Sequence, residues 1–447
     1  MFEIRPSVDH ALRRELNDEV HTRPPDSLTT PSLVSYLVSM SAREGSPVDL
    51  LDDLLRRFDA GKPAADTKHF TTMLDDVRLR WERHTEYSRY SFVRTGVGRN
   101  AFSSAKAAAV PADWLEKMAG NVFVGVHAWL VSREDVDEDI ENLSADFFDG
   151  NLLIGSKVAD ERATALTDLR IHSDGFSRLL LINDGMPEAQ AGRVLQRLLE
   201  IETYRMMALL ALPVAQQLTP GLDADERELT AIGDILVDAE SHQEQDLLDR
   251  LTRLSAGSQN RRLKSSYRFA AADAYYEIVL QRINELRETR IPGLQTFEEF
   301  TTRRLAPAVK TYRAVSNRQQ SVLEQMARAT KLLSTRVDIA RQKQNQSLLA
   351  SVSRRVKAQL RLQATVEGLS AAAVTYYVVG LVGILAESIG TAGVPINPAI
   401  AMGISIPFVA AIAFLGIRRI RRGISMDESG EINGIEAADD LDATRSQ

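Results

Sequence analysis

Glu82, His84 and Glu86 occupy every second position of a segment rich in β-forming residues. On a β-strand this spacing places all three side chains on one face. Two carboxylates and an imidazole so arranged could hold a divalent cation, which would permit metal-assisted chemistry. Arg80 would share that face, so the alternative is a structural ladder of ion pairs.

His21 and Arg23 form a second polar pair, directly before Pro24 and Pro25. A residue that precedes proline favours an extended backbone, so this segment should be rigid. An exposed imidazole and guanidinium there could bind an anionic ligand. The alternative is a structural loop that docks on a sheet.

Other familiar catalytic signatures are missing from the sequence. Cysteine is absent, which excludes disulfides, thiolate metal sites and a cysteine nucleophile. The chain has no Walker-type glycine loop, Gly-x-Ser-x-Gly elbow or His-Glu-x-x-His helix. We therefore predict a protein without catalytic activity, for which a divalent cation is the one candidate cofactor.

Length and charge limit the other function classes. A chain of 447 residues should form two or three folding units. Its net charge of −7 resides mostly in residues 424–447, which we expect to form an acidic disordered tail. The rest is almost neutral, so charge gives no reason to expect a nucleic-acid partner.

The first 185 residues predict an α+β domain. Segments with strand-like composition lie at 79–93, 121–131, 152–169 and 176–182, and helical patterns lie at 10–19 and 48–58. Ser32 to Met40 could be a strand or a helix.

Residues 186–307 change to helical periodicity. We expect one helix to stop near Pro213 and a turn at Ser255 to Asn260, where glycine, serine and asparagine gather. The aromatic residues of this region predict a buried helix stripe, formed by Tyr267, Phe269, Tyr275 and Tyr276.

Residues 308–367 contain no proline and no glycine and predict one long stalk helix. Apolar residues recur along it at intervals of three, four or seven, namely Val315, Val322, Met326, Leu333, Val337 and Ala340, and they are followed by Leu348, Leu349, Val352, Val356 and Leu360. Such a stripe must be buried against other helices, either of the same chain or of neighbouring protomers. A coiled coil and a homo-oligomer are therefore expected.

Two uncharged runs, 368–386 and 398–417, are each long enough to cross a bilayer and form a predicted transmembrane hairpin at 368–417. Arginine and lysine flank the hairpin on both sides, and the loop between the spans has none. Because positive charge is retained in the cytoplasm, we predict an integral protein of the cytoplasmic membrane with both termini inside. The lipid bilayer is then its main partner.

Four strings spread along the chain, Asn17–Pro25, Arg80–Glu86, Glu202–Leu210 and Leu360–Ser370, resemble a bacterial family of predicted membrane-anchored proteins of unknown function. The resemblance implies anchoring and no particular activity. The layout is also similar to that of CorA-type magnesium channels, whose Gly-Met-Asn signature is absent here. A pore in such an assembly would be lined by Tyr376 and Tyr377, with Glu367 and Glu387 at its mouths.

These observations favour a membrane-anchored, homo-oligomeric scaffold or sensor. A CorA-like cation-conducting assembly is the first alternative, and a metal-dependent enzyme is the second.

Overall fold

The computed structural model describes residues 10–14, 16–17, 26–40, 47–64, 67–102, 110–118, 120–136, 139–238, 244–391 and 397–416. The chain divides into two compact units, Met1–Ser334 and Thr335–Gln447. The predicted α+β class is confirmed, since a sheet precedes a run of long helices.

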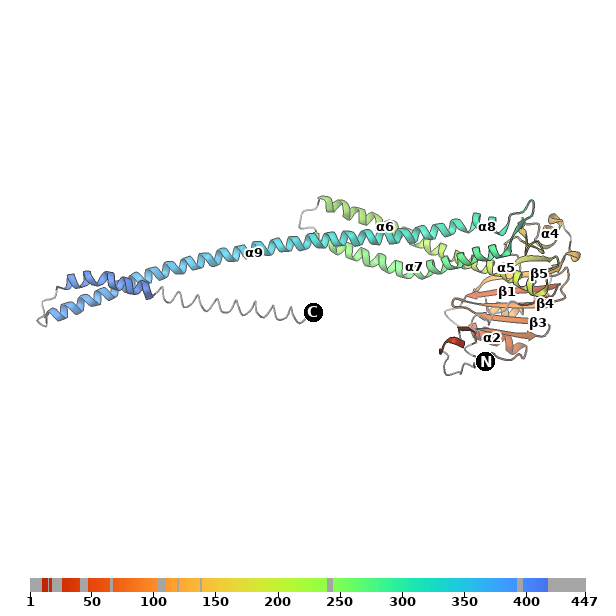
Figure 1. The fold of residues 1–447 in the computed structure, drawn as a ribbon, viewed down its shortest axis with the longest axis horizontal. Helices are drawn as coiled ribbons and strands as arrows, with labels where there is room; N and C mark the ends of the chain where they lie inside the picture. The colour runs from red at the N-terminus through yellow and green to blue at the C-terminus, as the bar shows by residue number, and fades with distance from the viewer. Residues whose placement is uncertain are drawn as a thin grey trace, which may run out of the picture. The chain divides into compact units, whose positions relative to one another are not determined.

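The first unit, hereafter the sheet unit, is built on a nine-stranded sheet. Figure 1 shows several of its strands side by side. The strands are β1 (Ser32–Met40), β2 (His69–Leu74), β3 (Val77–Arg83), β4 (Tyr87–Thr95), β5 (Val122–Ser132), β6 (Ile154–Val158), β7 (Ala163–Thr167), β8 (Ser177–Asn183) and β9 (Thr289–Arg290). Their order is β2-β3-β4-β1-β5-β8-β7-β6-β9. Neighbouring strands are antiparallel except β5 and β8, which are parallel.

The helices of this unit cover both faces of the sheet. They are α2 (Pro47–Arg57), α3 (Ala112–Lys117), α4 (Ile140–Phe147), α5 (Glu188–Leu209), α6 (Ala211–Asp238), α7 (Glu244–Leu286), α8 (Phe297–Arg304) and the first part of α9 (Ala306–Thr391). Alternation along each strand gives the sheet two apolar faces. One face packs on α5 and, through it, on the other long helices, whereas α2, α3 and α4 cover the opposite face.

Most predicted strands and helices have the predicted type, but their boundaries differ from the observed ones. The predicted strand at 79–93 is a hairpin of β3 and β4, and the one at 152–169 contains β6 and β7. Ser32 to Met40 is a strand, β1, which is buried on both faces in the centre of the sheet. A run buried on both faces lacks the alternation that distinguishes strand from helix, which explains the ambiguity.

The helical region begins at Glu188, as its periodicity predicts. The predicted stop near Pro213 lies at Leu210, between α5 and α6. The predicted turn at Ser255 to Asn260 is wrong, because α7 continues through it. Arg261 of α7 forms an ion pair with Asp225 of α6, so packing between the two helices outweighs the low helix propensity of the segment.

The apolar stripe of α9 has two different environments. In the first unit, Val315, Val322, Met326 and Leu333 are buried in the core that also contains α5, α6 and α7. The first half of the stripe is therefore covered by helices of the same chain. In the second unit, Leu348, Leu349, Val352, Val356 and Leu360 are exposed.

The second unit contains two helical segments that are long and apolar enough to cross a membrane, one at the end of α9 and one at Pro398–Gly416. They approach each other closely at Gly383, where an added Cβ would lie 2.5 Å from Met402 Sδ. Ala386, one turn further along, is buried. Small residues thus permit the close contact of the two helices, as their enrichment in the sequence suggests.

Gly192 permits a comparable contact in the first unit. A Cβ at Gly192 would overlap the carbonyl oxygen of Asp26, and Leu28 N donates to Glu188 O at 3.2 Å. The segment 26–28 therefore lies directly against the first turns of α5.

We expect Gly192→Ala to destabilise the protein by about 2 kcal/mol, because the methyl group must displace backbone. Tryptophan fluorescence of the full-length protein during urea unfolding would measure the change, since Trp81, Trp114 and Trp129 all lie in the sheet unit. Gly233→Ala in α6 is the matched control, because its added Cβ meets no atom within 4 Å. There, replacing a helical glycine should increase stability by about 0.5–1 kcal/mol. Equal behaviour of the two variants would contradict the close contact.

Candidate functional site

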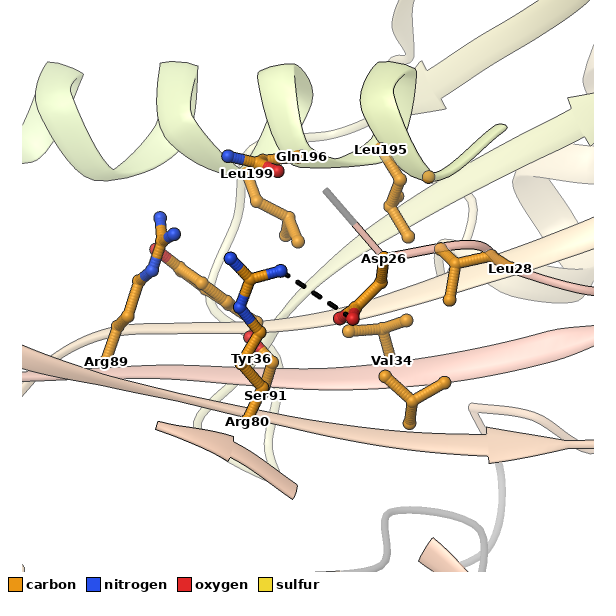
Figure 2. Close-up of a pocket in the computed structure, with 12 residues that line it drawn as sticks. Asp26, Leu28, Val34, Tyr36, Arg80, Arg89, Ser91, Leu195, Gln196 and Leu199 are labelled. Atoms are coloured by element: carbon orange, nitrogen blue, oxygen red, sulfur yellow. Dashed lines mark ion pairs between the residues drawn. The ribbon is translucent and has the colours of Figure 1, made fainter. Parts of the chain in front are cut away.

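A cavity of about 40 Å³ lies between the sheet and α5. Figure 2 shows Arg80, Arg89 and Tyr36 projecting from the sheet toward this helix, which contributes Leu195, Gln196 and Leu199. The polar side chains that line the cavity are Asp26, Tyr36, Arg80, Arg89, Ser91 and Gln196. The apolar side chains that line it are Leu28, Val34, Val93, Leu195 and Leu199.

Side chains of strand β3 alternate between the two faces of the sheet, and those on one face form the polar side of the cavity. Val77, Leu79 and Trp81 are buried on the opposite face of the sheet, in the cluster that includes α2 and α3. The intervening residues Arg80 and Glu82 therefore point toward α5. Strand β4 adds Arg89, which pairs with Glu82 in the register of the two strands.

Glu82 is the centre of a chain of ion pairs. Its side chain is 0% exposed and contacts Arg80 at 2.7 Å and Arg89 at 2.5 Å. Arg80 also lies 3.6 Å from Asp26, the pair drawn as a dashed line in Figure 2. Arg89 lies 3.8 Å from Glu200 of α5.

The chain of charges continues from α5 to α7. Glu200 accepts a hydrogen bond from Gln196 at 2.7 Å and another from Arg282 at 2.5 Å. Arg282 donates to Glu285, which also accepts from Arg197. Charges of alternating sign therefore connect the segment before β1 to β3, β4, α5 and α7.

The pKa of Glu82 reflects this environment. Burial alone would raise it, but the interaction with His84 and the charges of Arg89 and Arg80 outweigh burial. The pKa of the Glu82 carboxyl therefore lies well below its ordinary value, and the group is ionised throughout the physiological range. Burial would likewise lower the pKa of Arg89, but the opposing charges, among them that of Glu82, raise it instead.

The volume and charge of this cavity limit what it can bind. A cavity of about 40 Å³ accommodates a few water molecules or one small polar group. The two guanidinium groups are neutralised by Glu82, Asp26 and Glu200. The arrangement is suited to joining α5 to the sheet, and it leaves no room for an organic substrate.

The structure separates the three predicted metal ligands. Strand β3 ends at Arg83, and His84 N donates to Tyr87 O to close the turn, so Glu86 does not share a strand face with Glu82. His84 Nε2 lies 3.6 Å from Glu82 Oε2. Glu86 instead forms an ion pair with Arg268 and accepts a hydrogen bond from Tyr275 at 2.6 Å.

The shared-face prediction for Glu82, His84 and Glu86 is therefore wrong. Within the described part of the chain, no three His, Asp or Glu side chains are grouped so as to hold a metal ion. The alternative, an ion-pair ladder that includes Arg80 and Glu82, matches the observed contacts.

Several other predicted residues lie elsewhere. His21 and Arg23, like residues 424–447, are outside the described residues. Tyr376 and Tyr377 lie in α9 with side chains 78% and 71% exposed. Glu367 accepts a hydrogen bond from Gln363, and Glu387 is exposed. A pore lined by these residues stays a prediction.

Sequence reasoning did not identify a buried polar cluster on the opposite face of the sheet. Ser35 of β1 lies opposite His127 of β5, and Ser35 Oγ is 3.0 Å from His127 Nδ1. Asp174 lies 4.0 Å from His127 Nε2. Burial, opposed by Asp174, lowers the pKa of His127 to about 4, so the ring is neutral at pH 7. Ser35 is buried and thus lacks the access that a nucleophile needs.

A family comparison matches nearly the whole chain. Residues 8–424 match the model of a family described as "Protein of unknown function (DUF3422)". The chain belongs to the DUF3422 family. No curated protein and no solved structure matches it. The resemblance to an uncharacterised family, inferred from four strings, is therefore confirmed for this DUF3422 protein.

In this DUF3422 protein we expect Glu82→Gln to reduce stability by about 3 kcal/mol, because it leaves Arg80 and Arg89 buried without their shared carboxylate. Urea unfolding of the full-length protein, followed by tryptophan fluorescence, would measure the loss.

Glu161→Gln is the matched control for that variant. Glu161 pairs with Lys157 at 3.4 Å, and both side chains are largely exposed. Removing this pair should change stability by less than about 0.5 kcal/mol. A loss in Glu82→Gln no larger than in Glu161→Gln would show that Glu82 is not the centre of the network.

Proposed function

We propose that this DUF3422 protein is a membrane-anchored, homo-oligomeric scaffold or sensor without catalytic activity. The observation that carries the proposal is the pair of apolar helical segments in the second unit. Their large apolar side chains point outward, including Leu381, Ile384, Ile404, Phe408 and Ile412. In water these surfaces would be costly to expose, whereas lipid would solvate them.

The distribution of basic residues supports a specific orientation. Arg354, Arg355, Lys357 and Arg361 precede the first span. Arg418, Arg419, Arg421 and Arg422 follow the second. The connecting residues carry no lysine or arginine. By the positive-inside rule, both termini face the cytoplasm and the sheet unit lies on the same side.

A topology reporter tests this orientation in cells. Fused after Gln447 or before Met1, the reporter should behave as cytoplasmic. Inserted at Gly393, between the two spans, it should behave as external. A cytoplasmic signal at Gly393 would contradict the hairpin topology.

Self-association is supported by two surfaces of the second unit. The exposed stripe from Leu348 to Leu360 continues the spacing of residues that are buried in the first unit. In the first span, Tyr376 and Tyr377 contact each other edge to face, and neither hydroxyl has a hydrogen-bond partner among the described residues. A hydroxyl within hydrocarbon is stabilised by a partner, which a second copy of the chain would supply.

Replacing both Leu349 and Val352 with Asp should convert the detergent-solubilised oligomer to a smaller species, because charges would replace the apolar contact between stalks. Multi-angle light scattering of the full-length protein would measure the protein mass. Replacing both Leu263 and Val237 with Asp is the matched control, since both residues are exposed in the first unit and should not affect mass. A monomeric wild-type protein would remove the scaffold proposal.

The ion-pair network supports a sensor more than an enzyme. It joins strands β3 and β4 to helices α5 and α7 through buried charges, so displacement of one element would disturb the others. The separated positions of Glu82 and Glu86 give no support to a metal-dependent enzyme. No observation favours cation conduction over anchoring.

A further inference from the structure

Helix α9 is strongly basic where it approaches the first apolar span. Arg354, Arg355, Lys357 and Arg361 lie there with exposed side chains. Among the described residues, none of these four side chains has a hydrogen-bond or ion-pair partner. Residues 339–366 include no aspartate and no glutamate. The positive charge is therefore not balanced within this part of the helix.

Three of these cations share one side of the helix. Arg354, Lys357 and Arg361 are spaced by three and four residues, so they lie within about 60° of one another around the helix axis. We call them the basic face. The exposed apolar stripe, which includes Leu349 and Val356, is centred about 130° away. A second copy of the chain packed on the apolar stripe would thus leave the basic face accessible.

The basic face lies close to the expected surface of the bilayer. Helix α9 is continuous over Ala306–Thr391, so distances along it follow from the rise of about 1.5 Å per residue. Arg361 lies about 10 Å before the uncharged run that begins at Gly368, and Lys357 lies about 17 Å before it. The headgroup layer takes up roughly 5–8 Å of these distances. Both cations are therefore within about 10 Å of the headgroups, close to the Debye length of about 8 Å at physiological salt.

We propose that the basic face binds the headgroups of anionic phospholipids. Anionic headgroups complement its charge, and the bilayer that α9 enters is the lipid surface directly beside these cations. Each lysine or arginine close to such a surface strengthens the attraction by about fivefold. Four arginines within residues 418–422, which follow the second span, would face the same leaflet. The inference rests on the proposed anchoring, and it names the class of ligand that the sensor would detect.

Energy transfer to labelled lipids tests the proposal in vesicles. The chain has no cysteine, so Ala358→Cys gives a single site for a donor dye beside the basic face. The full-length protein is reconstituted in phosphatidylcholine vesicles that contain a small fraction of phosphatidylglycerol or phosphatidylcholine labelled on the acyl chain. Phosphatidylglycerol should be enriched near the dye at least threefold over phosphatidylcholine. Salt of about 1 M should remove most of this excess, because it shortens the Debye length to about 3 Å.

Variants assign the lipid preference to the basic face. The double variant Lys357→Gln and Arg361→Gln should lose more than half of the enrichment, because it removes the two cations nearest the headgroups. Lys343→Gln is the matched control, since Lys343 is exposed five turns earlier on the same side of α9 and about 38 Å from Gly368, where salt screens its charge. Enrichment that survives the double variant, or that falls equally in Lys343→Gln, would overturn the assignment.

Two further outcomes separate this inference from the proposed anchoring. A protein that floats with phosphatidylcholine vesicles but does not enrich phosphatidylglycerol would overturn the lipid preference and leave anchoring intact. If enrichment then appeared in a chain that ends at Gly423, the acidic residues 424–447 would be the occupant of the basic face instead. A protein that does not float with phosphatidylcholine vesicles at all would contradict anchoring, and the lipid inference would fall with it.

Discussion

A single buried carboxylate constrains the architecture of the sheet unit. Glu82 is ionised and excluded from water, so its charge must be balanced by Arg80 and Arg89, which in turn require Asp26 and Glu200. These partners come from the segment before β1, two strands and α5. The mutual position of the sheet and its covering helix is therefore specified by electrostatics as well as by apolar packing.

The apolar residues would permit several placements of α5, because aliphatic side chains tolerate sliding and repacking. Charges of alternating sign tolerate it far less, since a shift of α5 by one turn would move Glu200 away from Arg89 and leave that cation without this carboxylate. A hydrogen bond of 2.9 Å between the Tyr36 hydroxyl and Thr203 further fixes the position of α5 along the sheet. Gly192 then permits the backbone of segment 26–28 to contact the same helix. Packing and charge thus act together on one interface.

The sequence predicted the elements well where one physical signal dominated. The change to helical periodicity after Pro187 and the uncharged runs of the two spans were clear for that reason. The shared-face prediction failed at a turn: alternation of Glu82, His84 and Glu86 is evident in the sequence, but the end of β3 at Arg83 depends on pairing with β4. Ser35 and His127, 92 positions apart, could not be paired without the strand order.

The stripe on α9 shows a second limit of sequence patterns. Spacing established that one face of the helix is apolar, but it did not distinguish cover by the same chain from cover by another molecule. Leu333 is buried among α6, α7 and their neighbours, whereas Leu349 and Val352 are exposed. Because α6 ends at Asp238 and α7 begins at Glu244, these helices cover only the first part of the stripe.

The order of the strands has a consequence for the way the sheet unit must be synthesised. Strands β2, β3, β4 and β1 pair among themselves, and only β5 joins them to the second half of the sheet. Until β5 has been synthesised and has left the ribosome, strand β1 presents a long apolar edge with unpaired backbone groups. Such edges recruit other chains. A nascent chain that ends after α3 is thus the intermediate most prone to misassembly. Dividing the unit after α3 would likewise separate β1 from β5, so each half would lack the strand that its exposed edge pairs with.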